Sequence, residues 1–417
     1  MIELIYAARN VKTDIYKINR MKKQLLVLVA VISVSFAFAG ACKNRGVASA
    51  DIPLLTGAEQ LDLYLPLLEG KKVGMMGNQT SVVEGKHLVD VLLENGVNLK
   101  FAFAPEHGFR GDIERGESVR NDIDVKTGLT LHTLYGRNDK ADSIVASVDI
   151  MIFDLQDVGA RFYTYVASMH RVMQLCANNG KKLIVLDRPN PNGDQVDGPV
   201  RKSDEFKSNV SFHKVAMIHG LTVGELAKMI NGEGWLDNGA KCDLEVIKVS
   251  GYTHKTLYEL PTVPSPSLPN YTSIRLYMSL CLFEGTDVSV GRGTDYPFQV
   301  IGYPDPAFGE FTFTPGVRPG MAAHVEQQDN LCYGLDLRNI NPKEAKFTLK
   351  YILDFYKKAP EKFFSRPDFF NKLAGNADLQ EQIKVGWTEE QIREGWREEL
   401  TAYKQMRKKY LLYEDFE

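Results

Sequence analysis

The sequence predicts an α/β protein whose first large domain is built around an open parallel sheet. Five short apolar runs follow one another along the 417-residue chain at spacings that leave room for helices. The runs are continuously apolar rather than alternating, which is typical of strands covered on both faces. Helix-like patterns lie between them, and strands that alternate with helices favour right-handed crossovers and therefore parallel pairing.

The predicted strands come in a regular order with the predicted helices. The strands span 72–77, 99–104, 149–155, 182–187 and 244–249, and the helices span 87–95, 163–179 and 222–232. Gly180 is a typical helix stop after the second helix. Thr222 followed three residues later by Glu225 predicts a capping box at the start of the third.

The pattern changes near residue 260. Segment 260–270 holds four prolines, so it is predicted to be a stiff extended connection. Beyond it, amphipathic helices are predicted over 345–357 and 388–410, the second opening with a Thr388/Gln391 capping box. Aromatic residues of this region are expected in the core: Phe363, Phe364, Phe369, Phe370, Trp387 and Trp396. We therefore divide the chain into residues 1–41, 42–260 and 261–417.

The amino-terminal residues have the pattern of a secretory signal peptide. Segment 25–38 is uncharged and almost wholly apolar, Lys22 and Lys23 precede it, and small residues follow it. It is too short to favour a membrane-spanning helix. Met21 is then the expected start, and Cys42 is a candidate lipidation site after a lipobox-like Ala-Gly-Ala. We expect an exported protein, periplasmic or anchored to the membrane through a lipid on Cys42.

Composition excludes several classes of function. The net charge is −3, and removal of residues 1–41 takes away six Lys/Arg and two Asp/Glu, which leaves −7. Nucleic acid is therefore not an expected partner. Cys176, Cys242 and Cys281 are predicted to be buried free thiols, although export leaves a disulfide open. No Gly-x-Gly-x-x-Gly follows the first strand, so a dinucleotide site is not indicated.

Polar residues follow three of the predicted strands. Glu106, His107 and Arg110 come after the second strand; Gln156, Asp157, Arg161 and Tyr163 after the third; Asn190 and Asn192 after the fourth. Open α/β sheets bind ligands beyond the carboxyl ends of their strands, so these clusters are predicted to converge on one site. Turn chemistry alone could explain 188–193, but it does not require Glu106 or Asp157.

A glycine-flanked arginine lies in the second half of the chain. Gly291-Arg292-Gly293 allows close approach of the backbone to a ligand, and the arginine can bind a carboxylate through two nitrogens. A solvated glycine-rich turn is the alternative. A metal site from Glu106, His107 and Asp154 is conceivable but has no spacing signature.

Long motifs resemble the former DUF1343 family, now described as NamZ-type exo-β-N-acetylmuramidases. They are PEHGFRG at 105–111, DLQDVGARFYTY at 154–165, LDRPNPNG at 186–193, HGLTVGELA at 219–227, LFEGTDVSVGRGTDYPF at 282–298 and FFNKLAGN at 369–376. The resemblance implies a Rossmann-like domain, a smaller α+β carboxyl-terminal domain and an active-site cleft between them. It also implies a cofactor-free, exo-acting glycoside hydrolase that releases N-acetylmuramic acid from the non-reducing ends of peptidoglycan fragments.

The resemblance also suggests roles for individual residues. Glu106 is expected to be the catalytic acid or acid/base, with Asp154 or Asp157 as the neighbouring carboxylate. Alternatively, the acetamido oxygen of the sugar is the nucleophile, and Asp157 or Tyr163 orients it.

Substrate binding needs a different set of side chains. A cation should select the lactyl carboxylate of muramic acid, for which Arg292 and Arg161 are candidates and Arg110 the reserve. Arg161 could instead pair with Asp157. Further expected substrate-binding residues are His107, Gln156, Asn190, Asn192, His219 and Glu284. Two other functions stay open: a non-catalytic lipoprotein that binds cell-wall sugars, and a metal-dependent hydrolase centred on Glu106 and His107.

Overall fold

The computed structural model describes residues 52–106, 108–110, 122–134, 139–318 and 325–417. The predicted signal peptide, Cys42 and His107 lie outside these residues. Within the described residues, no helix combines the length and apolarity needed to cross a membrane.

The central sheet of the described chain has the strand order β11-β8-β7-β1-β4-β6-β5. Its strands are β1 (Lys72–Gly77), β4 (Asn98–Ala104), β5 (Asp122–Ile123), β6 (Thr130–Thr133), β7 (Ile150–Asp154), β8 (Lys182–Leu186) and β11 (Asp243–Ile247). All neighbours pair in parallel except β5, which runs antiparallel to β6. The five predicted strands and the parallel sheet are confirmed. β5 and β6 were not predicted, because they are short and lack a continuous apolar run.

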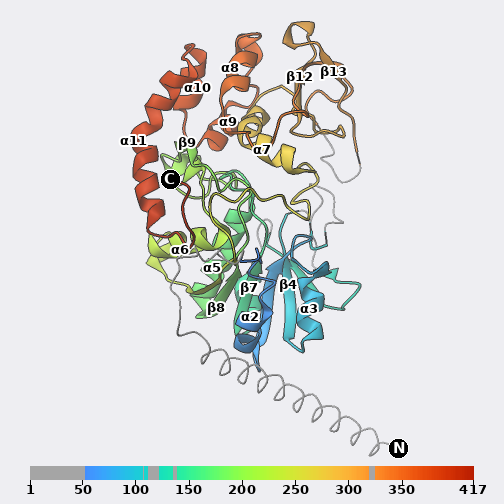
Figure 1. Cartoon of the computed structure of the whole chain (residues 1–417), viewed down its shortest axis with the longest axis vertical. Helices are drawn as coiled ribbons and strands as arrows, with labels where there is room; N and C mark the ends of the chain where they lie inside the picture. Colours follow the sequence, from blue (N-terminus) through green and yellow to red (C-terminus); the bar gives the residue numbers. More distant parts are fainter. Residues whose placement is uncertain (1–51, 107, 111–121, 135–138, 319–324) are drawn as a thin grey trace, which may run out of the picture. The chain divides into compact units, whose positions relative to one another are not determined.

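Helices cover both faces of this sheet (Figure 1). Their bounds are α2 (Leu61–Leu68), α3 (Leu88–Glu94), α4 (Ala141–Ala146), α5 (Tyr165–Asn179) and α6 (Val223–Gly232). Met75 packs into one hydrophobic cluster with α2 and α3, whereas the next residue, Met76, packs into another with α4, α5 and α6. This alternation follows from the period of two in a strand. The capping box between Thr222 and Glu225 is present as predicted.

The second half of the described chain forms a smaller α+β part. Its antiparallel sheet has the order β12-β14-β13, from Val300–Tyr303, Cys332–Asp336 and Phe311–Phe313. Its helices are α7 (Tyr271–Leu280), α8 (Lys350–Tyr356), α9 (Pro367–Ala374), α10 (Asp378–Lys384) and α11 (Glu389–Lys408). The ribbon of β9 (Asp197–Val200) and β10 (Ala216–Ile218) lies beside α11, and β2 (Val82–Val83) pairs with β3 (Lys86–His87).

Several predictions for this half are confirmed and others are wrong. The Thr388/Gln391 capping box opens α11, whereas the helix predicted to begin at 345 begins only at Lys350. Phe363, Phe370 and Trp396 are buried, but Trp387 is 41% exposed and does not belong to the core. The predicted buried free thiols are present at Cys176, Cys242 and Cys281.

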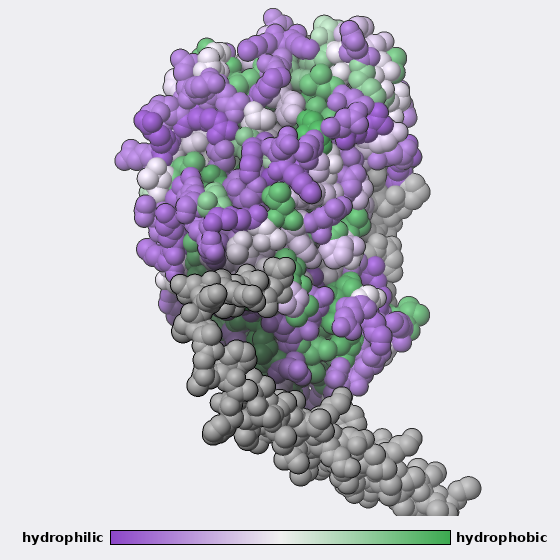
Figure 2. Space-filling view, in the orientation of Figure 1, coloured by the Kyte–Doolittle hydropathy of each residue, from purple (hydrophilic) through white to green (hydrophobic). Residues whose placement is uncertain are grey.

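The hydrophobic residues of both halves share one core. Phe162, Tyr277, Phe298 and Trp396 belong to a single cluster of buried side chains. On the face shown in Figure 2, hydrophilic residues predominate, and hydrophobic ones are scattered among them. The hydrophobic side chains of the described residues lie mainly in the interior.

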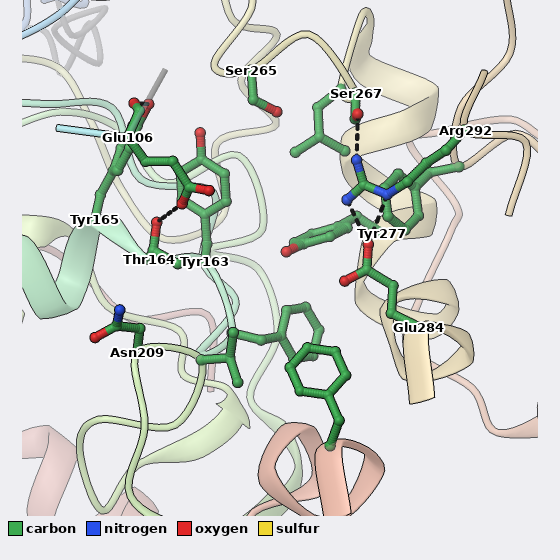
Figure 3. Close-up of a pocket in the computed structure, with 15 residues that line it drawn as sticks. Glu106, Tyr163, Thr164, Tyr165, Asn209, Ser265, Ser267, Tyr277, Glu284 and Arg292 are labelled. Carbon is green, nitrogen blue, oxygen red and sulfur yellow. Dashed lines mark hydrogen bonds and ion pairs between the residues drawn. The ribbon is translucent and has the colours of Figure 1, made fainter. Parts of the chain in front are cut away.

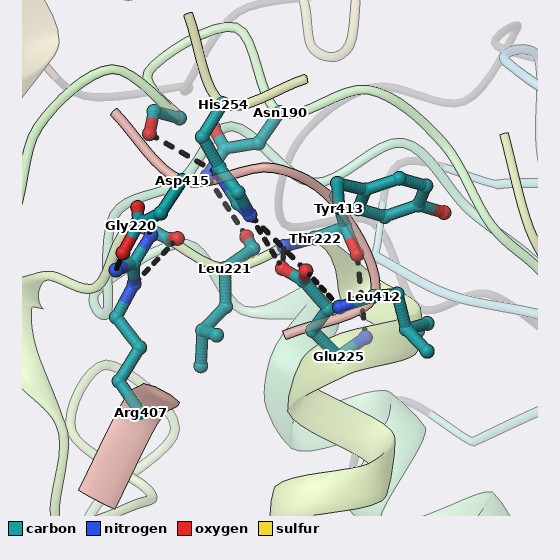
Figure 4. A network of polar contacts seen from close by, with 12 residues as sticks. Asn190, Gly220, Leu221, Thr222, Glu225, His254, Arg407, Leu412, Tyr413 and Asp415 are labelled. Atoms are coloured by element: carbon teal, nitrogen blue, oxygen red, sulfur yellow. Dashed lines mark hydrogen bonds and ion pairs between the residues drawn. The ribbon is translucent and has the colours of Figure 1, made fainter. Parts of the chain in front are cut away.

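The carboxyl-terminal residues return to the α/β domain through a buried polar network (Figure 4). Arg407 donates to Asp415 at 2.8 Å and to the carbonyl of Gly220 at 2.9 Å. The backbone N–H of Leu412 donates to Glu225, whose carboxylate also lies 3.0 Å from His254 Nε2. The chain end is thus held to the first turn of α6.

Asp187 belongs to the same network, because it accepts hydrogen bonds from Thr222 and Tyr413. Its buried carboxyl group makes the stability of the protein depend on pH. Burial raises the pKa of Asp187 to about 6, although hydrogen bonds from Tyr413 and Thr222 lower it. Its ordinary pKa is 3.8, so between pH 4 and 6 the folded protein holds a proton that the unfolded chain releases. This group therefore lowers the free energy of unfolding as pH rises, by about 3 kcal/mol in total.

Urea denaturation of the wild type and of Asp187→Asn at pH 4 to 7 measures this effect. The free energy of unfolding of the wild type, minus that of the variant, should fall with rising pH by that amount. A difference that stays constant or rises would contradict the assignment.

Candidate active site

The order of the central sheet places a crevice beside β1. The chain runs outward from β1 to β4 and β6 on one side, and then returns to β7, β8 and β11 on the other. Ligands of open α/β sheets bind beyond the carboxyl ends of the strands at this point of reversal. Glu106 follows β4, and segment 156–165 follows β7. The two segments therefore flank the expected site.

A cavity of about 240 Å³ lies there, and both halves of the chain line it (Figure 3). The α/β half contributes Glu106, Phe162, Tyr163, Thr164, Tyr165, Asn209 and Val210. The remaining lining residues are Ser265, Ser267, Leu268, Tyr277, Glu284, Arg292, Phe298 and Phe369. The cleft expected between the two halves is thus present.

Glu106 is held on one wall of this cavity. The hydroxyl of Thr164 donates to Glu106 Oε2 at 2.9 Å. The hydroxyl of Tyr165 donates to the backbone carbonyl of Glu106 at 3.3 Å, and Asn78 donates to the same hydroxyl at 2.8 Å. The start of α5 therefore orients both the backbone and the carboxyl group of Glu106.

An ion pair lies across the cavity from Glu106 (Figure 3). Arg292 Nε donates to Glu284 Oε1 at 2.8 Å, Nη2 donates to the same oxygen, and Nη1 donates to Ser267. The guanidinium also lies 4.9 Å from the centre of the Phe298 ring. Burial lowers the pKa of Arg292, but the charge and hydrogen bonds of Glu284 outweigh this and raise it. The arginine is therefore charged throughout the physiological range.

Aromatic rings form an apolar wall of the cavity. Tyr277 packs edge-on against Phe162 at 5.0 Å and against Phe298 at 4.9 Å between ring centres. Burial raises the pKa of Tyr163 and of Tyr277 well above the ordinary value, so both hydroxyls remain neutral donors. The hydroxyl of Tyr163 donates to the carbonyl of Pro264 at 2.9 Å. The wall thus combines apolar ring faces with fixed hydroxyl groups.

Of the predicted site residues, the structure brings Glu106, Tyr163, Glu284 and Arg292 together at this cavity. Asp154 lies elsewhere: it is fully buried and accepts two hydrogen bonds from Arg188, at 2.6 and 2.9 Å. This placement does not support the expectation that Asp154 is the carboxylate beside Glu106, because the side chain is held in this ion pair and does not line the cavity.

Asp157 and His219 do not belong to the lining of this cavity either. Asp157 accepts a hydrogen bond from the N–H of Gly159 at 2.7 Å, and its carboxylate lies 3.2 Å from His219 Nε2. Gln156 donates to the carbonyls of Asp157 and Pro189, both at 2.8 Å. These contacts shape the loop after β7, so the expected roles in catalysis and sugar binding are not supported by their placement.

Asn190 and Asn192 also contact the loop that follows β7. Asn190 donates to the carbonyl of Leu221 at 2.8 Å, and Asn192 donates to that of Val158 at 2.7 Å. Gly159 has φ +79°, and a Cβ at this position would lie 2.2 Å from Asn190 Oδ1. Only glycine fits here. The two asparagines therefore order the loop, and the expectation that they bind sugar hydroxyls is not supported.

Arg161, the second candidate for the lactyl carboxylate, and Arg110, the reserve, are also engaged elsewhere. Arg161 donates to four backbone carbonyls, those of Pro199, Val215, Leu373 and Ala374, at 2.7 to 3.0 Å. Burial and the nearby charge of Arg201 lower the pKa of Arg161 to about 9. Arg110 forms ion pairs with Asp124 and Asp90. These partners do not support a role of Arg161 or Arg110 in binding a lactyl group, and neither residue lines the cavity. The alternative pairing of Arg161 with Asp157 is not supported either, because the four acceptors of Arg161 are backbone carbonyls.

Several lining residues were missed. Thr164 and Tyr165 belong to the predicted polar cluster, where the helix start was the only available signal. Ser265 and Ser267 alternate with prolines in the connection, and this alternation could have suggested side chains held on a stiff backbone. Phe369 was expected in the core, whereas it lines the cavity. The described residues contain no group of three His, Cys, Asp or Glu that could hold a metal ion.

Comparison with known proteins agrees with this geometry. Residues 73–272 match the model of the amino-terminal part of exo-β-N-acetylmuramidase NamZ, and residues 275–413 match the model of its carboxyl-terminal part. The chain belongs to the NamZ family. A NamZ relative, the peptidoglycan β-N-acetylmuramidase of Bacillus subtilis strain 168, is 37% identical over 375 residues, which cover 84% of this chain and 89% of the relative.

Two solved structures from Bacteroides fragilis NCTC 9343, both described as DUF1343 family proteins, share the fold. The first is 43% identical with a TM-score of 0.80, and the second is 27% identical with a TM-score of 0.76. Each comparison covers 87% of this chain and 99% of the other. The NamZ fold therefore extends over nearly all of the described residues.

Proposed function

We propose that the protein is an exo-acting glycoside hydrolase that removes N-acetylmuramic acid from the non-reducing ends of peptidoglycan fragments. Membership of the NamZ family supports this reaction. The observation that carries the proposal is the Glu106 carboxyl group, held by Thr164 at the wall of a cavity of about 240 Å³. Such a cavity has room for about eight water molecules, which suits one terminal sugar better than a long chain.

Glu106 is proposed to protonate the glycosidic oxygen as the sugar leaves. Glycoside hydrolysis needs a carboxylic acid at that oxygen, and most such enzymes place a second carboxyl group on the other side of the scissile bond. Glu284 meets this description better than Asp154 or Asp157, because it lines the cavity opposite Glu106. One carboxyl group bonded to a hydroxyl and another in an ion pair have the different surroundings that distinct roles require.

Arg292 is proposed to select the lactyl carboxylate. It is the one cationic side chain among the described residues that line the cavity. Arg292→Ala is expected to reduce the preference for an N-acetylmuramic acid glycoside over an N-acetylglucosamine glycoside by about 10- to 100-fold, since a hydrogen bond to a charged group contributes about 1.5–3 kcal/mol. The ratio of the two kcat/KM values measures this, because general damage to the site cancels in it. An unchanged ratio would refute the assignment.

Product analysis tests the reaction itself. The purified protein should release free N-acetylmuramic acid from a fragment that carries this sugar at its non-reducing end, and should leave a fragment capped by N-acetylglucosamine intact. Binding without release would favour a sugar-binding protein. Release that EDTA abolishes would favour the metal-dependent alternative.

The proposed substrate lies in the cell wall, and we propose that the protein is exported to reach it. The apolar segment 25–38 and the following Cys42 support export and lipidation. Cys42→Ser is expected to move the protein from the membrane fraction to the soluble periplasmic fraction. Cell fractionation of the wild type and of the variant measures this. Retention of the wild type in the cytoplasm would contradict the proposal.

A further inference from the structure

A second cavity of about 190 Å³ lies on another part of the molecule. It is lined by α5, by the segments that follow β9 and precede β10, and by the turn after α6. The lining residues are His170, Arg201, Asp204, Lys207, Phe212, His213, Lys214 and Trp235. None of them lines the first cavity, and neither the sequence analysis nor the proposed reaction uses them.

The floor of this second cavity is built from buried polar groups. His170, His213 and Arg201 are only 6%, 4% and 4% exposed. His170 Nδ1 lies 3.0 Å from His213 Nε2, so the two rings share one hydrogen bond. Arg201 donates to the carbonyl of Phe212 at 3.3 Å and to Asp204 at 2.8 Å, while its buried Nε has no hydrogen-bond partner in the described part of the chain. These groups hold a fixed arrangement before any ligand arrives.

The charge of the cavity is positive. Among the lining residues, the cations are Arg201, Lys207 and Lys214, and the one carboxylate is that of Asp204, whose side chain is 75% exposed. Lys214 lies 4.0 Å from this carboxylate, and the Lys207 ammonium lies 4.8 Å from the centre of the Phe212 ring. Burial and the charge of Lys207 lower the pKa of His170 to about 4, so this ring adds no charge at neutral pH. The lining residues of the cavity therefore carry two more positive than negative charges.

The aromatic rings and the volume of the second cavity limit the class of ligand that it can bind. His213 stacks on Trp235 with 5.5 Å between ring centres and 23° between planes. The volume has room for about six water molecules, enough for a phosphate or for the carboxylate end of an acidic sugar. Lysine ammonium groups and histidine N–H groups are donors, and oxyanions are the acceptors that such a set recognises.

We infer that this second cavity is a binding site for a small oxyanion. Free phosphate and the carboxylate of N-acetylmuramic acid have this chemistry in common. The ligand would lie between Lys207 and Lys214, against the rings of Phe212 and Trp235, and would compete with Asp204 for the cations.

The same segment of chain reaches both cavities. Asn209 and Val210 line the first, while Lys207 and Phe212 line the second. Arg171, the neighbour of His170 in α5, donates to Asn209 at 2.8 Å. A ligand in the second cavity would thus contact the segment that presents Asn209 to the first.

Fluorescence of Trp235 provides a test that requires no catalysis. The full protein is titrated with phosphate, with N-acetylmuramic acid and with N-acetylglucosamine at constant ionic strength, and Trp235→Phe identifies the signal among the three tryptophans. A saturable change with phosphate or with N-acetylmuramic acid is expected, and the responsive probe identifies the source of the oxyanion. Lys207→Gln/Lys214→Gln should weaken this binding by about 10-fold or more.

Two further variants separate this site from the first cavity. Asp204→Asn should tighten binding, because it removes the competing carboxylate, and Glu106→Gln should leave binding unchanged even where it abolishes hydrolysis. The inference is overturned if neither anion gives a saturable change, if the lysine variant binds as the wild type does, or if neutral N-acetylglucosamine binds equally well. The result does not depend on whether the protein hydrolyses any glycoside.

Discussion

Replacement of Glu106 by glutamine is expected to reduce kcat on the natural fragment by about 10²- to 10⁴-fold, the usual contribution of a positioned general acid. Glutamine keeps the shape of the side chain and can still accept the hydrogen bond that Thr164 donates to Glu106 at 2.9 Å, so the fold and KM should change little. Steady-state kinetics on the wild type and variant measure the loss.

A change of the leaving group of the substrate tests whether Glu106 acts as the acid or only binds the sugar. A glycoside whose leaving group is already acidic needs little protonation, so Glu106→Gln should impair its hydrolysis much less than hydrolysis of the natural fragment. Glu94→Gln is a matched control, because Glu94 is exposed, pairs with Lys86 and does not line the cavity. Equal losses on both substrates would argue against the acid role.

Replacement of Asp154 by asparagine is expected to lower the free energy of unfolding by about 3–5 kcal/mol, because it leaves a buried charge without its partner. The partner is Arg188, whose side chain is 5% exposed and donates to Asp154 at 2.6 Å. Urea denaturation measures the loss. Activity per folded molecule should remain close to that of the wild type, since Asp154 does not line the cavity.

A double variant provides the control for this effect. Asp154→Asn/Arg188→Met removes the unpaired charge and should recover part of the lost stability. A single variant that keeps wild-type stability but loses as much activity as Glu106→Gln would instead restore Asp154 to the catalytic role that its place in the sequence suggested.

The sheet was predictable because its strands are covered on both faces. Continuous apolar runs such as the one in β7 occur in few other settings, and the parallel order then follows from the helices between them. β6 has the sequence TLHT and is only partly buried, so its pairing with β4 could not be recognised from composition.

The site was predictable at the level of position but not of orientation. The rule that ligands bind at strand ends selected Glu106 and Tyr163, and both line the cavity. The same rule selected Asp154, and nothing in a linear sequence shows that Arg188 approaches that carboxylate from the next strand. Ser265 and Ser267 were missed for a related reason, because they come from a connection whose path over the cavity depends on tertiary packing.

The hydrogen bonds from Arg161 to backbone carbonyls affect which substitutions this fold can tolerate. The four acceptors of Arg161 described above are all backbone carbonyls, and two of them, at Leu373 and Ala374, end the helix that carries Phe369. Such acceptors exist whatever side chain a position bears. Substitutions at the four partner positions can therefore accumulate without loosening the joint between the two halves, provided that the arginine itself is kept. The next residue, Gly375, does not share this freedom, because a Cβ there would lie 2.6 Å from the guanidinium of Arg161.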